Sequence, residues 1–262
     1  MPRDYIGFYL VRCFCISDIH VDYEENAAWI ASLSCFDYRD DILIVAGDLT
    51  DNVQLLEKSL RQLADRFNKV LFVPGNHDLW VVRSKQRTSF EKFDLIRRIA
   101  SDIGIIMEPY HSGSLTVVPL LGWYDYSFGV PSVEHQERWM DYRACLWPEG
   151  YNESEITRYF TEKNIQHLDL KNETLISFSH FLPRIDLMPA YIPHNKRMLY
   201  PILGSSILDR QVQRLKPNIH IYGHSHVNRK VRLDDISYIN NAFGYPQETR
   251  ITTKKLMCIY TQ

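Results

Sequence analysis

Five short apolar segments constrain the fold of this 262-residue chain more than any other feature. They occupy residues 14–17, 42–46, 70–73, 175–178 and 219–222, and a polar turn follows each of them. Continuous apolar runs of four or five residues are typical of strands that are buried on both faces, as in a sheet covered by helices. The segments therefore predict buried strands whose ends carry polar loops.

Helical patterns separate these segments. Residues 54–67 place leucines on one stripe, and residues 88–103 open with a Thr-x-x-Glu sequence that is typical of a helix start. Two more helices are expected over residues 22–29 and 206–215. Strands alternating with helices predict an α/β fold, and we expect residues 1–262 to form a single domain.

A stretch rich in aromatic residues interrupts this alternation. We expect a helix near residues 132–145 within it, and an insert or cap at about residues 123–165. Two interpretations stay open, because the rings could pack as a satellite cluster or cover a site and stack on a ligand. The large aromatic residues concerned are Trp123, Tyr124, Tyr126, Phe128, Trp139, Tyr142, Trp147 and Tyr151.

Composition excludes several classes of protein. Lys and Arg number 30 against 32 Asp and Glu, so the basic excess of an obligate nucleic-acid binder is missing. No apolar run approaches the roughly 20 residues that a membrane span needs. Five scattered cysteines do not form a disulfide framework, and the beginning of the sequence lacks a cleavage site. We therefore expect a cytoplasmic protein.

The polar turns contain residues that bind metal ions. They read Asp18-Ile19-His20, then GDLTDN at 47–52, GNHD at 75–78, Ser179-His180 and GHSH at 223–226. Oxygen and imidazole ligands gather there without a single cysteine. That donor set suits manganese, iron, zinc or cobalt and argues against a thiolate zinc site.

The spacing within these turns also favours convergence. Side chains at i and i+2 of an extended segment point the same way, so we expect Asp18 to approach His20 and His224 to approach His226. Three glycines permit sharp turns and a close approach of the backbone to the ions: Gly47, Gly75 and Gly223.

Taken in order, DIH, GDLTD, GNHD, SH and GHSH resemble the motifs of the calcineurin-like metallophosphoesterase superfamily. They span residues 18–226, and SYINNAFGYP near the end resembles a closing strand and loop of that family. The resemblance implies a four-layer α-β-β-α sandwich with two mixed sheets and a dinuclear metal centre at their edge. It does not identify a substrate.

The resemblance also implies roles for individual residues. One ion would be bound by Asp18, His20, Asp48 and His226, and the other by Asp48, Asn76, His180 and His224. His77 would be the catalytic histidine, oriented by Asp78. Manganese is the expected metal, with iron, zinc, cobalt or nickel as alternatives. Asn52 stands where protein Ser/Thr phosphatases carry an arginine, which argues against that activity.

We therefore expect a metal-dependent phosphoesterase that hydrolyses mono- or diesters of a small molecule or nucleotide. The alternatives are a metal-dependent nuclease and a non-catalytic binding scaffold, although the presence of His77 argues against the scaffold. The oligomeric state stays open.

Arg184 is either a phosphate ligand or a surface residue. The other histidines are expected on the surface or in hydrogen bonds: His111, His135, His167 and His194.

Overall fold

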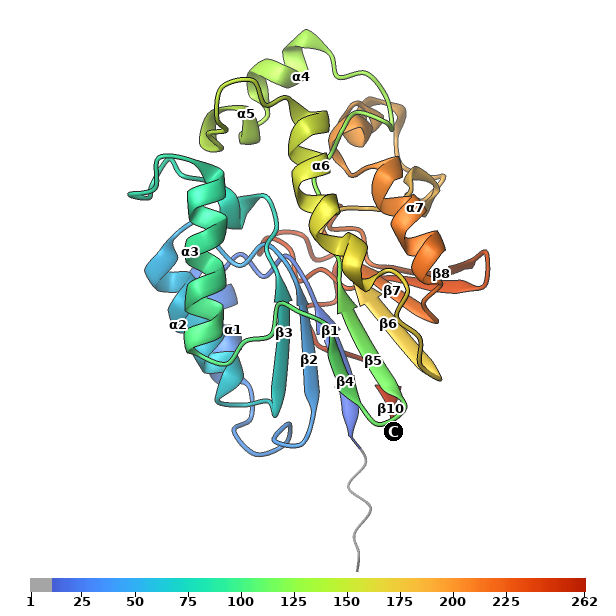
Figure 1. The fold of residues 1–262 in the computed structure, drawn as a ribbon. Helices are drawn as coiled ribbons and strands as arrows, with labels where there is room; N and C mark the ends of the chain where they lie inside the picture. The colour runs from blue at the N-terminus through green and yellow to red at the C-terminus, as the bar shows by residue number, and fades with distance from the viewer. Residues whose placement is uncertain (1–10) are drawn as a thin grey trace, which may run out of the picture.

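The computed structural model describes residues 11–262 and contains two sheets that pack against each other (Figure 1). The first has the strand order β10 (Met257–Thr261), β1 (Arg12–Ile16), β2 (Ile42–Ala46), β3 (Lys69–Val73). The second has the order β4 (Tyr110–Ser112), β5 (Leu115–Pro119), β6 (Thr174–Phe178), β7 (Ile219–Tyr222), β9 (Ile236–Asn240), β8 (Arg229–Leu233). Each sheet joins parallel and antiparallel strands, which confirms the expected pair of mixed sheets.

Helices cover the outer faces of both sheets. Figure 1 shows three helices beside the first sheet, namely α1 (Glu24–Ser32), α2 (Val53–Ala64) and α3 (Ser89–Asp102). Beside the second sheet lie α6 (Glu153–Asn164) and α7 (Ser206–Leu215). This arrangement confirms the α-β-β-α sandwich. Among residues 11–262, no helix has the length and apolar character needed to cross a membrane.

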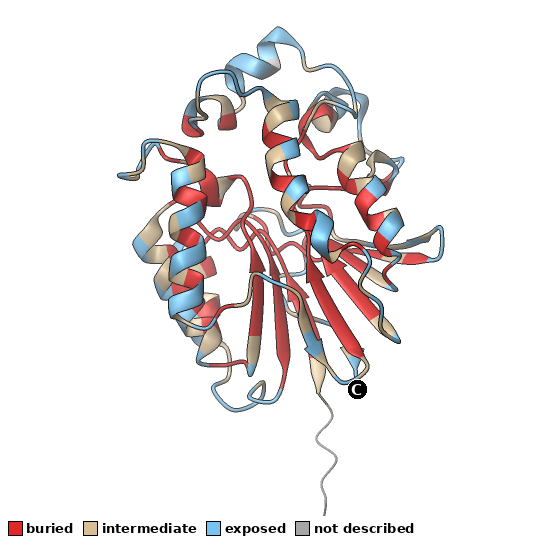
Figure 2. Ribbon diagram, viewed as in Figure 1, coloured by how far each residue is buried: buried red, intermediate tan, exposed pale blue. Residues whose placement is uncertain are grey.

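Strand β2 shows how the layers are held together. All five of its residues are buried (Figure 2). Ile42 and Ile44 pack in the core between the sheets, together with Cys13 and Cys15 of β1. Leu43 of β2 belongs to the other core, which the helices close. The alternation follows from the period of two in a strand, and it explains why the sequence shows a continuous apolar run.

Local sequence accounts for most helix ends. The Asn52 side chain accepts a hydrogen bond from the Leu55 N–H at 3.0 Å and caps α2. Thr88 caps α3 in the same way, as its spacing from Glu91 predicted. The helix expected at 22–29 begins only at Glu24.

The single helix predicted near residues 132–145 is wrong. The chain forms two short helices there, α4 (Val133–Arg138) and α5 (Asp141–Ala144). Trp139 lies between them and turns its indole N–H to the Asp141 carboxylate, at 2.8 Å. A continuous helix would place residues two apart on different faces, so this hydrogen bond requires the break.

Candidate active site

Loops at the carboxyl ends of five strands bring the predicted ligands together. Three groups of side chains have ligand atoms within 4.8 Å of one another: Asp18, His20 and His226; Asp48, His180 and His224; and His20, Asp48 and His77. Asn76 joins them, because its Oδ1 lies 3.0 Å from Nε2 of His180. Loops from both sheets thus contribute to one cluster, in which Asp48 belongs to two groups.

The backbone at the cluster is left-handed and not extended. Asp18 and His20 do converge in one group, whereas His224 and His226 belong to different groups, and the extended geometry predicted for these pairs is wrong. The φ angles lie between 48° and 64° at Asp18, His20, Asp48, His224 and His226. Non-glycine residues rarely adopt this conformation, and it costs about 1–3 kcal/mol at each position. The fold therefore stabilises a strained set of loops in order to converge these side chains.

The three predicted glycines, Gly47, Gly75 and Gly223, are required by close approach, and a Cβ atom on Gly47 would lie 2.5 Å from Nδ1 of His180. A Cβ atom on Gly75 would lie 2.7 Å from Nε2 of His180, and one on Gly223 would lie 2.8 Å from Oδ2 of Asp18. Real Cβ atoms do not approach so closely, so any larger residue would displace a ligand side chain.

Hydrogen bonds to backbone carbonyls determine which ring nitrogens face the cluster. Nδ1 of His180 lies 2.9 Å from the Ala46 carbonyl, and Nε2 of His224 lies 3.1 Å from the Ile202 carbonyl. A carbonyl only accepts, so both of these nitrogens carry their ring's proton. The remaining nitrogens, Nε2 of His180 and Nδ1 of His224, face each other at 3.2 Å with their lone pairs.

Two more acceptors point at the same place. Nε2 of His180 lies 3.0 Å from Oδ1 of Asn76 and 3.5 Å from Oδ2 of Asp48. The Asn76 amide nitrogen cannot supply a proton there, because it donates to Asp141 at 2.9 Å. When Asp48 is ionised, four acceptors thus converge without a donor among them, an arrangement that a bound cation would satisfy. The donor set fits a divalent metal ion.

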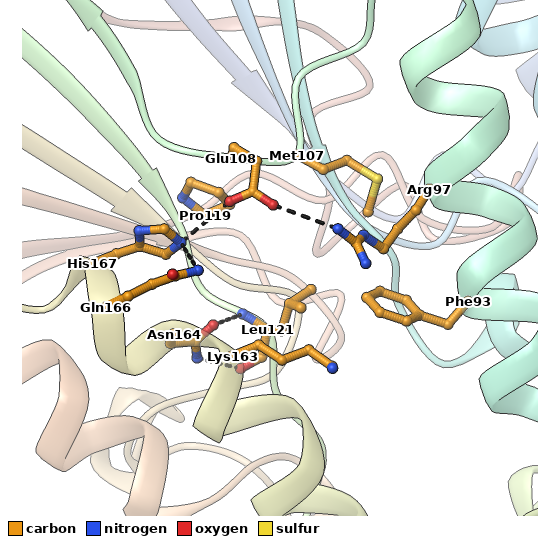
Figure 3. A pocket seen from close by; sticks show the side chains of 10 residues that line it. All are labelled: Phe93, Arg97, Met107, Glu108, Pro119, Leu121, Lys163, Asn164, Gln166 and His167. Atoms are coloured by element: carbon orange, nitrogen blue, oxygen red, sulfur yellow. Dashed lines mark hydrogen bonds and ion pairs between the residues drawn. The ribbon is translucent and has the colours of Figure 1, made fainter.

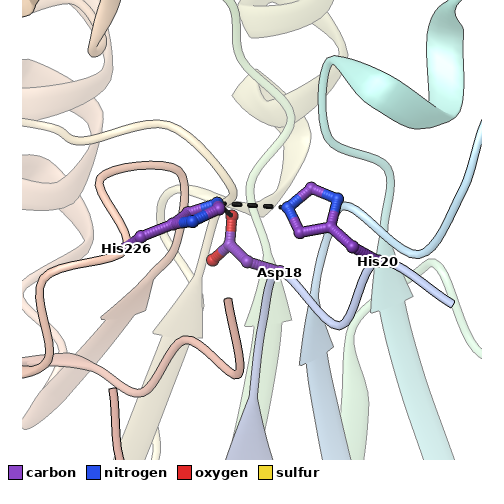
Figure 4. A group of neighbouring side chains, drawn as sticks. All are labelled: Asp18, His20 and His226. Carbon is purple, nitrogen blue, oxygen red and sulfur yellow. Dashed lines mark hydrogen bonds and ion pairs between the residues drawn. The ribbon is translucent and has the colours of Figure 1, made fainter. Parts of the chain in front are cut away.

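Figure 4 shows the other half of the cluster. Nε2 of His226 lies 3.3 Å from Oδ1 of Asp18 and 3.1 Å from Nε2 of His20. Its Nδ1 lies 2.6 Å from the Glu248 carboxylate. Burial lowers the pKa of His226, but Asp18 and Glu248 outweigh it and raise that pKa to about 10. Without an ion His226 is therefore protonated, and a metal would replace that proton.

The other imidazoles are held in the neutral form that binds metals. Burial lowers the pKa of His20, His180 and His224, and neighbouring histidines add to the effect at each. Neutral imidazole is the form that coordinates divalent ions, so these three need no deprotonation at neutral pH.

The expected orienting role of Asp78 is wrong. Its Oδ1 accepts the N–H groups of Leu49 and Thr50, at 2.9 and 3.0 Å. Its Oδ2 accepts those of Asp48 and Gly75, both at 2.8 Å. All four donors are backbone groups, and within residues 11–262 the Asp78 carboxylate forms no hydrogen bond or ion pair with an imidazole. Asp78 therefore fastens two ligand-bearing loops to each other.

Replacing Asp78 with asparagine should destabilise the protein by about 2–6 kcal/mol. An amide can accept through only one atom, so two buried backbone N–H groups would lose their acceptor at about 1–3 kcal/mol each. Urea unfolding of the metal-free protein measures the change. Asp94→Asn, the same change at an exposed position on α3, is the control. A loss below 1 kcal/mol would contradict this role.

His77 is held by ring contacts. It stacks on Trp80 with ring centroids 3.7 Å apart, and its edge meets His20 at 4.7 Å. Its Nε2 lies 4.0 Å from Oδ2 of Asp48, and 18% of its side chain is exposed. Burial, followed by the charges of His226 and His180, lowers the pKa of His77 to about 3. The free protein therefore carries a neutral imidazole at this position.

The cluster opens into a cavity of about 230 Å³. Trp139, Leu199 and Tyr245 form its apolar wall, and Tyr245 lies 4.5 Å from the His20 ring. The sequence places Trp139 in a stretch that could cover a site, but it does not assign Leu199, Tyr245 or Glu248 to the site. Within the aromatic stretch, Trp139 lines the cavity, which fits the interpretation that this stretch covers a site. Trp123 is buried in the core, which fits the interpretation that the rings pack against one another.

Residues outside the cluster match their expected roles as structural groups. Nδ1 of His111 lies 2.8 Å from Oγ1 of Thr116, and His194 is exposed. Arg184 forms ion pairs with Asp186 and Asp234 on the surface. The side chain of His135 falls outside the described part of the structure.

His167 lies in a separate cavity of about 230 Å³ between α3 and the end of α6 (Figure 3). Its Nε2 is 3.3 Å from Glu108, whose other carboxylate oxygen is 3.8 Å from Arg97. Lys163 also lines this cavity, which contains none of the predicted ligands.

Comparisons with known proteins agree with this geometry. The sequence profile of calcineurin-like phosphoesterases matches residues 11–228. The [acyl-carrier-protein] phosphodiesterase PptH of Mycobacterium tuberculosis is 27% identical over 265 residues, covering 90% of this chain and 79% of the relative. The crystal structure of phosphopantetheinyl hydrolase (PptH) from M. tuberculosis superposes with a TM-score of 0.79 at 24% identity, covering 95% of each chain. The chain therefore belongs to the calcineurin-like phosphoesterase family, whose members use divalent metals, and it is a hydrolase of phosphoester bonds.

Proposed function

We propose that this hydrolase cleaves phosphodiesters with a dinuclear centre, in which Asp48 bridges the two ions. Asp18, His20 and His226 would complete one set of ligands, and Asn76, His180 and His224 the other. The observation that supports this most is the convergence of three ligand atoms, on Asn76, His224 and Asp48, around the unprotonated Nε2 of His180. Manganese is the metal we expect to find.

The ions and the side chains would have different roles in catalysis. Two divalent ions, with a charge of about +4 against two carboxylates, would polarise the phosphoryl oxygens and acidify the attacking water. The chain positions its ligands through fixed hydrogen bonds, so little reorganisation is needed during the reaction. His77 lies at the rim of the cluster, where it can give a proton to the departing alcohol.

His77 is neutral in the free protein, so it has to take up a proton from the solvent when the substrate binds. Its pKa of about 3 in the free protein reflects burial, and no carboxylate within residues 11–262 forms a hydrogen bond with its ring to offset this. A phosphodiester anion beside the ring would favour the charged imidazolium and raise the pKa. His77 would thus become an acid only in the enzyme–substrate complex, where the leaving group requires one.

We propose a phosphopantetheinyl group on an acyl carrier protein as the substrate. The named activity of the M. tuberculosis relative supports this choice, as does the similar extent of the two folds. The apolar wall of Trp139, Leu199 and Tyr245 offers packing for the organic part of such a diester. Bond cleavage would leave the carrier protein without its prosthetic group.

Intact-mass spectrometry tests this function. The manganese-loaded protein is incubated with a carrier protein bearing the phosphopantetheinyl group, and the expected result is loss of that group. Bis-p-nitrophenyl phosphate, p-nitrophenyl phosphate, a cyclic nucleotide and single-stranded DNA are tested in parallel. Hydrolysis of the nucleotide or DNA with an intact carrier protein would reject the proposed substrate. Wild-type protein that binds no metal would reject the dinuclear centre.

A further inference from the structure

Asp141 holds three side-chain N–H donors around one buried carboxylate. It begins α5 in the aromatic stretch and is only 2% exposed. Its Oδ1 accepts Nδ2 of Asn76 at 2.9 Å and the indole N–H of Trp80 at 2.7 Å. Its Oδ2 accepts the indole N–H of Trp139 at 2.8 Å. The carboxylate therefore meets N–H donors from two segments of the chain, residues 76–80 and Trp139, and the Tyr124 hydroxyl is a further hydrogen-bond partner.

Each donor belongs to a different part of the active site. Asn76 turns its oxygen to His180 because its nitrogen is engaged by Asp141. Trp80 carries the stacked ring of His77. Trp139 lines the cavity. One carboxylate thus fixes the orientation of a ligand, the support of the proton donor and one wall of the substrate cavity.

We propose that Asp141 is a positioning residue that holds the Asn76 amide oxygen toward the ion bound by His180 and His224. This inference rests on the proposed function, in which Asn76 is a ligand. An amide alone can turn by half a rotation and present its nitrogen, which cannot bind a cation. The Asp141 carboxylate accepts and cannot donate, so it allows only the orientation with the oxygen inward.

The two substitutions Asp141→Ala and Asp141→Asn are expected to differ. Alanine removes the acceptor of Asn76, and one of the two manganese ions should bind about 10–100-fold more weakly, as found for lost outer-shell partners. Asparagine keeps one oxygen, which should stay with the two donors Asn76 and Trp80 while its amide faces Trp139. Both ions should then bind with affinities within about twofold of wild type.

Equilibrium dialysis with Mn²⁺ measures both affinities, and circular dichroism verifies folding. Glu149→Ala and Glu149→Gln make the same changes at an exposed position of the same segment and should leave both affinities unaltered. Unaltered binding in Asp141→Ala, or equal weakening of both ions, would overturn the inference. If the wild-type protein binds no manganese in this experiment, the proposed function is rejected instead.

A second measurement uses the metal-free protein and serves if Asp141→Ala does not fold. Trp139→Phe should lower Tm in the wild-type background, where it removes a hydrogen bond. In the Asp141→Asn background it should raise Tm, because it removes an indole N–H that faces an amide N–H. Equal lowering in both backgrounds would overturn the assigned hydrogen bonds, and with them the inference.

Discussion

Asp48→Ala is expected to strip both ions from the protein and to lower turnover at least 10³-fold, about 4 kcal/mol in the transition state. Its Oδ2 lies 3.5 Å from Nε2 of His180 and 4.0 Å from Nε2 of His20 and of His77. No other carboxylate of the described residues reaches both halves of the cluster. Removing it should therefore affect both metal positions, whereas removing Asp18 affects one.

The fold should survive this substitution. Burial, followed by the charges of Asp18 and Asp78, raises the pKa of Asp48, so an ionised Asp48 destabilises the metal-free protein. Metal content by mass spectrometry and hydrolysis of bis-p-nitrophenyl phosphate measure the effect. Asp40→Ala, at an exposed position, should change neither. An Asp48→Ala protein with two ions per chain would disprove the bridging role.

His77→Ala is expected to keep its metal ions and lose turnover of alkyl phosphodiesters by about 10²–10⁴-fold, the usual contribution of acid catalysis. A p-nitrophenolate leaving group departs without a proton, so its release should slow far less. His77 is suited to this selectivity because its ring is held by Trp80 and is partly exposed to the cavity.

Rates for a matched pair of esters, one alkyl and one p-nitrophenyl, separate this role from metal binding. His194→Ala removes an exposed histidine and should affect neither rate. Equal losses for both esters, or a loss of metal from His77→Ala, would show that His77 acts other than as the acid.

The sequence predicts those parts of the fold that are buried on both faces. The segments that become β1, β2, β3, β6 and β7 are apolar runs because helices cover one face of their sheet and the other sheet covers the opposite face. Strand β8 is an edge strand whose residues alternate between half-buried and exposed, so RKVRL contains no apolar run. Strand β5 is buried along its whole length but was not predicted, because Thr116 and Pro119 interrupt its apolar character, so burial alone does not make a strand visible in the sequence.

The same limit applies to the active site. Metal ligands are recognisable because they follow strands in short motifs. Glu248 and Asp141 reach their partners only through the folded chain, and no spacing relates Asp141 to Asn76, which lies 65 residues away. For Asp78 the sequence suggested a partner that the structure does not show. It is adjacent to His77 in the sequence, but its side chain accepts backbone N–H groups of other residues. Adjacent residues need not share a function.

The pairing of β1 with β10 has a consequence for biosynthesis. Arg12 lies opposite Thr261, and the Gly244 N–H donates to the Asp18 carbonyl at 2.8 Å. A ribosome that adds about 5–20 residues per second therefore delivers β1 and its metal-binding loop long before their partners. Until then one edge of the first sheet remains open to other nascent chains. If these loops bind metal as proposed, ion uptake would follow translation of residues 11–261, which contain both paired strands.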